Sequence, residues 1–236
     1  MAQLVNKRQL VFPGDVLAEG NYIAGKNTYR EQNRIYSSQI GFTDLIGKNI
    51  QVIALKGCYV PTIGDLVIGK IIDMRLNGWI VDINSPYMAM LFTSDVLGRS
   101  FNLRRDNMSD YLDIGDLVKA KVTTFDRTRD PVLTMKESGL GKVTQGHVTK
   151  INTTKIPRVI GKKGSMINLL KQGTGCDISI GQNGVVFISG KNPDLEALTI
   201  QAIHIIERDA HTDGLTDKIS ELIIKEKERM ESNVKG

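Results

Sequence analysis

The sequence has little cysteine and little histidine, and this scarcity excludes several kinds of metal and redox site. Its 236 residues include two cysteines, Cys58 and Cys176, and no C-x-x-C pair, so neither a zinc ribbon nor a redox motif is expected. The three histidines do not show the H-E-x-x-H spacing of a metalloprotease. We therefore expect no cofactor, no bound metal, and two reduced thiols in an intracellular, cytoplasmic protein.

Long hydrophobic runs are absent as well. No stretch reaches the roughly 18 apolar residues that a spanning helix needs, and residues 1–10 have no apolar segment of the secretory type. No membrane partner is therefore expected. The hydrophobic fraction of 41% is nevertheless too high for a disordered chain, and 23 glycines predict many tight turns.

The net charge of +5 is unevenly distributed along the chain. Residues 1–64 carry 7 basic and 4 acidic groups, and residues 139–212 carry 9 and 5. Residues 65–138 and 213–236 each carry a net charge of −1. The basic block at 139–212 is a moderate indication of a phosphate-rich partner, although a solvated basic face would look the same.

The first two segments have the pattern of small β domains. Residues 1–64 contain short apolar runs broken by turn signals, and they show no catalytic constellation. Residues 65–138 contain five short strands, which predicts an OB-fold barrel. In its fourth strand Val118, Ala120 and Val122 alternate with Leu117, Lys119 and Lys121, so the first three should be buried and both lysines should lie on the outer face.

Residues 139–212 change to a mixed pattern with the order β-α-α-β-β-α. Two helical stretches flank Gly161, a hairpin surrounds residues 181–184, and a last helix begins after Asn192. The predicted apolar face of this last helix consists of Leu195, Leu198, Ala202 and Ile205. Residues 213–236 contain a charged helix over 215–229, which we expect to pack on a neighbour. The predicted fold is thus mixed and mainly β, with an α/β C-terminal part.

A glycine-rich turn between the first two helices of this segment is the strongest signal. It is the run V-I-G-K-K-G-S-M-I from Val159 to Ile167. Two glycines let the backbone turn sharply close to a phosphate chain, and the N–H groups of the following helix would face that chain. This run resembles the G-x-x-G loop of a type I KH domain, which clamps about four nucleotides of a single strand. The RNA-binding candidates of the domain are Gly161, Lys162, Lys163 and Gly164, extended by Arg158 and Lys155.

The barrel resembles an S1 domain, through the run G-D-L-V-I-G-K-I from Gly64 and the run G-D-L-V-K-A-K-V from Gly115. That family binds single strands by base stacking and phosphate neutralisation. Asn77 and Ile80 replace two aromatic residues of the family, and Trp79 is predicted to belong to the core. Phe92 is therefore the stacking candidate. Further candidates for contact with RNA are the basic residues Lys119, Lys121, Arg104, Arg105, Arg127 and Arg129.

Two other signals are interpreted as structural. Residues 64–71 approach the P-loop pattern, but Ile71 stands where the hydroxyl residue should be. The acidic residues Asp106, Asp110, Asp113 and Asp116 suggest a metal-dependent nuclease, but they lack paired histidines and are interpreted as a solvated loop. No catalytic residue is assigned.

The order of a small N-terminal β domain, an S1 barrel and a KH domain resembles the S1/KH cap subunit of the archaeal RNA exosome. The resemblance implies a non-catalytic protein that binds single-stranded RNA. In that family three copies sit on a hexameric ring of RNase-PH-like subunits, dock through the N-terminal domain, and feed RNA to the ring for phosphorolysis from the 3′ end.

Three alternatives stay open at this point. The chain could be a free RNA-binding or ribosome-associated translation factor that uses the same two RNA modules. It could be a nuclease that uses the acidic loop. It could also be a structural protein that only holds a ring together.

Overall fold

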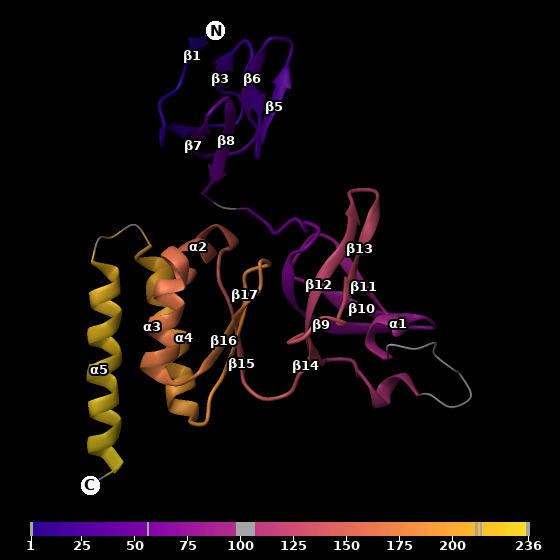
Figure 1. The fold of residues 1–236 in the computed structure, drawn as a ribbon, viewed down its shortest axis with the longest axis vertical. Coiled ribbons are helices and arrows are strands. Elements are labelled where there is room, and N and C mark those ends of the chain that lie inside the picture. Colours follow the sequence, from indigo (N-terminus) through magenta and orange to yellow (C-terminus); the bar gives the residue numbers. More distant parts are fainter. Residues whose placement is uncertain (1, 56, 98–106, 211, 213, 235–236) are drawn as a thin grey trace. The chain divides into compact units, whose positions relative to one another are not determined.

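The computed structural model describes residues 2–55, 57–97, 107–210, 212 and 214–234 (Figure 1). The chain divides into two compact units, Met1–Gly57 and Cys58–Gly236. None of the described helices is long and apolar enough to cross a membrane.

The first unit is built from two four-stranded sheets around one small core. One sheet has the order β1 (Ala2–Gln3), β3 (Val16–Glu19), β6 (Arg34–Ser37), β5 (Thr28–Glu31). The other has the order β2 (Leu10–Val11), β7 (Gly41–Ile46), β8 (Asn49–Ala54), β4 (Ile23–Ala24). Alternation along β8 directs Ile50, Val52 and Ala54 inward, where the first two join Leu17 and Ile35 in the core.

The second unit begins with a closed five-stranded barrel, as the sequence predicts. Its strands are β9 (Leu66–Arg75), β10 (Gly78–Asp82), β11 (Met88–Phe92), β12 (Leu117–Asp126) and β13 (Arg129–Thr134). β13 pairs with both β11 and β12, and this pairing closes the barrel. The predicted alternation in β12 is confirmed, because Val118, Ala120 and Val122 are buried and the intervening side chains are not. A short helix, α1 (Thr93–Leu97), follows β11, and a 3-10 turn spans Met108–Asp110.

The connection out of the barrel adds a further strand, β14 (Gly141–Val143), to the edge of β12. The α/β module then follows in the predicted order β-α-α-β-β-α. Its elements are β15 (His147–Lys150), α2 (Ile156–Ile160), α3 (Ser165–Thr174), β16 (Asp177–Ile180), β17 (Val185–Ser189) and α4 (Pro193–Arg208). The three strands form an antiparallel sheet with β17 in the middle, and one face of this sheet is covered by the helices (Figure 1).

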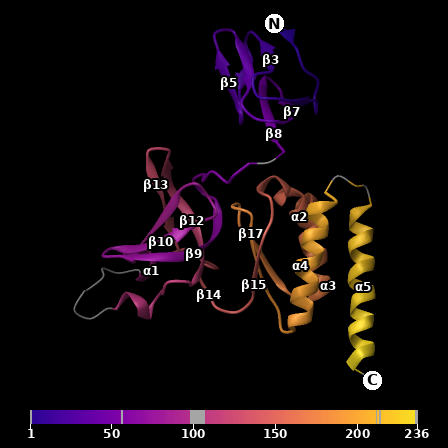
Figure 2. The same cartoon turned by 180° about the vertical axis from the view of Figure 1, so that it is seen from behind.

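The predicted C-terminal helix is longer than expected and belongs to the same core. It is α5 (Leu215–Val234), and it lies beside α4, seen from behind in Figure 2. Leu215, Ile219 and Ile223 are buried in the core of the α/β module. Gly173 in α3 permits a close approach, because a Cβ there would lie 3.1 Å from two carbon atoms of Ile223. α5 is therefore a brace of this module.

Candidate nucleic-acid interface

The turn between α2 and α3 has a backbone that depends on its two glycines. Gly161 ends α2 with φ 76° and ψ 174°, a region that is almost restricted to glycine. A Cβ on Gly161 would lie 2.7 Å from the backbone nitrogen of Met166, so the close approach of the two helices also requires glycine. Gly164 follows in the left-handed region at φ 81° and occupies the N-cap position of α3, where it has no side chain to bond the N–H groups of the first turn. No side chain caps this end of α3, and the N–H of Ser165 is bonded to the carbonyl oxygen of Lys162.

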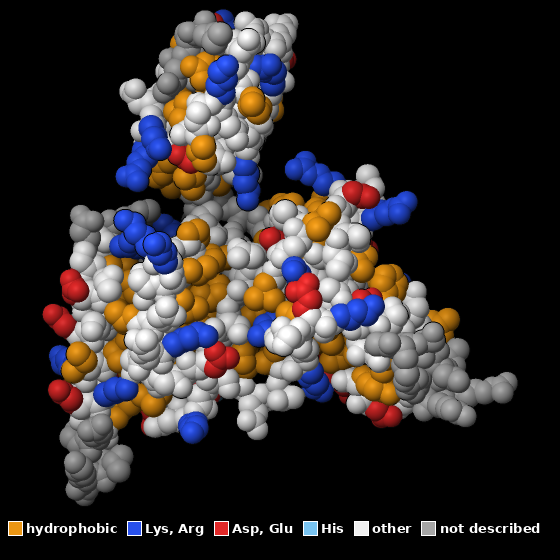
Figure 3. Space-filling view, in the orientation of Figure 1, with side chains coloured by type: hydrophobic (Ala, Val, Ile, Leu, Met, Phe, Trp, Pro, Cys, Tyr) orange, Lys and Arg blue, Asp and Glu red, His pale blue; other side chains and the backbone are white. Residues whose placement is uncertain are grey.

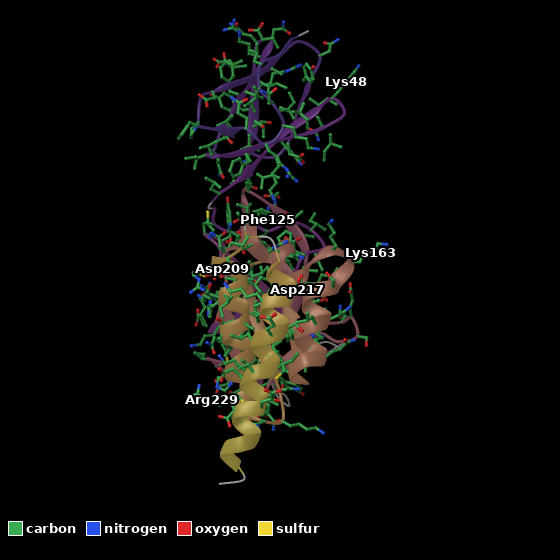
Figure 4. All side chains as sticks on the ribbon, turned by 90° about the vertical axis from the view of Figure 1, so that its left-hand side faces the viewer. Lys48, Phe125, Lys163, Asp209, Asp217 and Arg229 are labelled. Atoms are coloured by element: carbon green, nitrogen blue, oxygen red, sulfur yellow. The ribbon has the colours of Figure 1, made fainter. Side chains whose placement is uncertain are left out.

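The two lysines of this turn are the most available cations of the candidate set. Both Lys162 and Lys163 are exposed, and neither forms an ion pair with another described residue. Lys163 adopts φ 52° and ψ 29°, and Figure 4 shows its side chain at the edge of the module, directed away from the helices. The turn therefore presents two exposed positive charges at the start of α3, which is suitable for a phosphate backbone.

The two cations expected to extend this track are differently placed. Arg158 is exposed, and its Nη2 donates a hydrogen bond to the carbonyl oxygen of Thr212 at 3.0 Å. This bond ties α2 to the connection between α4 and α5. Lys155 is half-buried at the end of the 3-10 turn Thr153–Lys155, directly before α2. Figure 3 shows Lys and Arg side chains gathered over this end of the helices.

The barrel separates its two aromatic candidates as predicted. Trp79 is fully buried, and its Nε1–H donates a hydrogen bond to the carbonyl oxygen of Leu112 at 2.9 Å, so it is a core residue. Phe92 is half-buried at the end of β11, on the outer face of the barrel and directly opposite Gly78 of β10.

Arg127 and Arg129 lie at the tip of the β12–β13 hairpin, and both are exposed. Asp126 shapes this tip by accepting hydrogen bonds from the hydroxyl and the backbone N–H of Thr128. These bonds, together with the charge of Arg129, lower the pKa of Asp126 below its usual value. The two arginines are thus held on a defined turn.

The remaining cations of the barrel differ in how their charges are paired, which the sequence alone does not indicate. Lys121 forms an ion pair with Glu137 at 2.8 Å, so its charge is locally compensated. Lys119 donates a hydrogen bond to the Ser179 hydroxyl of β16 at 3.4 Å and therefore faces the α/β module. Arg104 and Arg105 lie outside the described residues. The candidate cations consequently fall into three places: the glycine turn, the hairpin tip and the outer face of β12.

In the described part of the acidic loop, Asp116 stabilises the local backbone instead of being free to bind a metal. Asp116 accepts the backbone N–H of Asp113 at 2.7 Å and pairs with Lys142 at 2.5 Å, and these contacts lower its pKa against the opposing effect of desolvation. Within the described part of the chain, no three His, Cys, Asp or Glu side chains form a group that could hold a metal ion. Asp106 lies outside the described residues.

The most consequential residue that the sequence did not reveal is Asn183, in the β16–β17 turn. It is fully buried, and its Nδ2 donates hydrogen bonds to the carbonyl oxygens of Ile68 and Ile83 at 2.8 and 2.9 Å. Its Oδ1 accepts the N–H of Ile68 at 3.4 Å, and the neighbouring Gln182 N–H donates to Leu66 O at 2.7 Å. The turn thereby fixes the α/β module to β9 of the barrel. Nothing local distinguishes this asparagine from that of an ordinary hairpin turn.

Comparison with known protein families gives matches to three successive segments of the chain. The family model described as "Exosome RNA binding protein RRP4 N-terminal domain" matches residues 8–56. The model "RRP4, S1 domain" matches residues 58–124, and the model "KH domain" matches residues 147–204. The barrel is therefore an S1 domain, and the α/β module is a KH domain.

Individual relatives give the same result. The chain is 46% identical to Exosome complex component Rrp4 of Pyrococcus furiosus, over 93% of this chain and 84% of the relative. It is also 46% identical to the protein of that name from Ignisphaera aggregans, over 94% and 92% of the two chains. A crystal structure of a proposed exosome complex RNA-binding protein superimposes with a TM-score of 0.71 at 45% identity, over 74% of this chain and 99% of that one. The predicted resemblance is thus confirmed, and the chain belongs to the Rrp4 family of archaeal exosome complex components.

Proposed function

We propose that this protein binds single-stranded RNA and delivers it to a ring of RNase-PH-like subunits, which degrades the RNA from its 3′ end by phosphorolysis. Three copies would sit on each ring, in the cytoplasm, and none of them would carry out the chemistry. Family membership supports assembly into an exosome. The S1 and KH domains support the binding of RNA.

The observation that carries the RNA-binding part is the geometry of the glycine turn. Gly161 and Gly164 hold a sharp backbone turn, Lys162 and Lys163 are exposed beside it, and α3 begins there without a side-chain cap. This combination recognises a phosphate backbone without selecting a base.

An apolar row on the first unit supports docking on a protein ring. Leu10 of β2 lies opposite Phe42 of β7, and Phe42 lies opposite Ile53 of β8, so the three side chains project from the same face of the sheet. Leu10 and Ile53 are 43% and 53% exposed, and Phe42 is half-buried. A contiguous apolar row of two exposed side chains and one half-buried side chain is suitable for a surface that a partner covers.

The RNA-binding proposal is tested by replacing both lysines of the turn with aspartate. We expect the double variant Lys162→Asp/Lys163→Asp to bind single-stranded RNA more weakly in a fluorescence anisotropy titration. Its plot of log affinity against log salt should also be shallower by about 1.4, since each neutralised phosphate contributes about 0.7 to the slope. A variant with the same charge change elsewhere in the module, Lys191→Asp/Lys225→Asp, is the control. Unchanged binding and slope in a folded variant of the turn would refute the assignment.

The docking proposal is tested by co-purification from the native cells, followed by measurement of the native mass. We expect RNase-PH-like subunits to co-purify, six for every three copies of this chain, and to be lost in Ile53→Asp. Ile224→Asp is the matched control, because Ile224 is 55% exposed on α5. Recovery of the chain alone, or with ribosomes, would instead favour a free RNA-binding or translation factor.

The absence of catalysis is tested by incubating the purified chain with labelled RNA, phosphate and Mg²⁺ or Mn²⁺. We expect no turnover. Degradation that survives purification and disappears in an Asp110→Asn/Asp113→Asn variant would show a nuclease.

A further inference from the structure

A groove of about 410 Å³ opens between the outer face of the KH sheet and the S1 barrel. One wall is formed by β12 and by residues 139–145, which connect the two domains. The other wall is formed by β16 and β17. None of its described lining residues belongs to α2, the glycine turn or α3, so the groove is separate from the RNA-binding turn. Its volume lies within the range of small-molecule sites.

The walls of this groove are held in place by contacts outside it. The buried Asn183 fixes the KH hairpin to β9, as described above. β14 is paired with β12 over three residues, which fixes the connecting segment. Lys119 bridges the two walls through its bond to Ser179. The groove is therefore preformed, and a ligand would not have to order it.

An aromatic ring and several hydroxyls line the KH side. Phe187 of β17 is half-buried and stands on the outer face of the sheet, directly opposite Ser179 of β16. Gly146 lies against the far edge of the ring, since a Cβ there would be 2.7 Å from Cζ of Phe187. The ring is thus held in position beside Ser179 and Ser189, whose hydroxyls can bond a sugar or a base edge.

The charge balance of the groove favours an anion. Asp177 also lines it, but Lys171 pairs with this carboxylate at 2.7 Å and, together with the charge of Lys119, lowers its pKa. The charge of Lys142 is likewise paired, with Asp116. Lys119 forms no ion pair within 4.0 Å among the described residues, and the lining carries two lysines, Lys119 and Lys142, against one aspartate, so its formal charge is net positive.

We propose that this groove binds one nucleotide of single-stranded RNA, as a second RNA subsite besides the glycine turn. The base stacks on Phe187, the phosphate pairs with Lys119, and Ser179 or Ser189 bonds the ribose or the base edge. This inference rests on the proposed RNA-binding function. It adds that one strand contacts the KH domain on both faces of its sheet.

The test compares two oligonucleotides on the full chain, one of four and one of twelve nucleotides. The short strand can be held by the glycine turn alone, whereas the long one can reach the groove as well. We expect Phe187→Leu and Lys119→Gln each to weaken binding of the long strand by on the order of tenfold and to leave the short strand unaffected. Lys119→Gln should also reduce the salt slope by about 0.7. Lys70→Gln, an exposed lysine on the neighbouring strand β9, is the control.

Cross-linking locates the strand directly. RNA that carries 4-thiouridine should cross-link to the peptide containing Phe187, in addition to a peptide of the glycine turn. A long strand that binds the groove variants normally and cross-links only at the turn would overturn the groove proposal and leave the RNA function intact. Failure of the unaltered chain to bind either strand would overturn both. Adenosine monophosphate that binds at the groove more tightly than the long strand would assign the groove to a free nucleotide instead.

Discussion

Replacement of Asn183 by alanine should uncouple the KH domain from the S1 barrel. The Asn183 carboxamide acts as a substitute for a strand neighbour, because it donates to and accepts from the backbone of Ile68 and also donates to Ile83 O. Ile68 and Ile83 are 1% and 0% exposed, so alanine would leave two carbonyl oxygens and one N–H group without a partner in a buried place.

The magnitude follows from these three groups. A buried polar group that loses its partner costs about 1–3 kcal/mol, and each carbonyl keeps a second lone pair. The 3.4 Å bond to the Ile68 N–H is long and contributes least. We therefore expect the free energy of unfolding to fall by roughly 2–5 kcal/mol. Because the lost contacts join the two domains, unfolding should also become less cooperative, with the KH domain melting before the barrel.

Chemical denaturation with two probes measures this. Trp79 is the single tryptophan and lies in the barrel core, so its fluorescence reports the S1 domain, while far-ultraviolet circular dichroism also reports the KH helices. The two curves should separate in Asn183→Ala. Gln182→Ala is the control, because Gln182 is exposed and its bond to Leu66 uses the backbone N–H. A loss below about 1 kcal/mol, with coincident curves, would refute the view that this turn couples the domains.

Three further expectations concern single side chains. Gly161→Ala should destabilise the KH domain more than Gly164→Ala in denaturant unfolding, because a Cβ at the first meets the backbone of α3 at 2.7 Å and at the second nothing closer than 3.6 Å; equal losses would contradict this. Trp79→Phe should cost about 1–3 kcal/mol by leaving a buried carbonyl unpaired and should not change RNA affinity, whereas a loss of affinity in the folded variant would reassign Trp79 to stacking. The Gly190 N–H holds the pKa of Glu196 below its ordinary 4.5, so this carboxylate stabilises the fold fully above pH 4.5 and loses its contribution as the pH falls through the lowered pKa. Glu196→Gln should therefore flatten the acid unfolding curve, and an unaltered curve would show that Glu196 has no part in it.

Much of the fold could be predicted from local patterns. The alternation of Val118, Ala120 and Val122 indicated which face of β12 is buried, because a strand with one wet face repeats every two residues. Trp79 was assigned to the core by the same period. The glycine turn was evident because its two glycines lie between two helical stretches, three residues apart. This pattern is complete within a short local sequence.

Contacts between distant parts could not be predicted in this way. Asn183 meets partners 115 and 100 residues away, and no period or motif records such a distance. The apolar face of α4 was also slightly misplaced: Ile203 and Ile206 are fully buried, whereas Ile205, which the pattern favoured, is half-buried. Ile203 and Ile206 belong to the core that also contains Leu215, Ile219 and Ile223 of α5, and Ile205 packs at its margin.

The position of α5 also has a consequence for the order in which the chain folds during synthesis. The strands of the S1 barrel are complete once β13 has left the ribosome, whereas the KH core lacks Leu215, Ile219 and Ile223 until α5 has emerged. Since domains fold as units and the earlier ones fold first, the barrel can present β9 as a finished template while the KH domain is still open. The hairpin that carries Asn183 then packs against β9, which has already folded. The S1 barrel, which is synthesised first, therefore determines the register between the two domains.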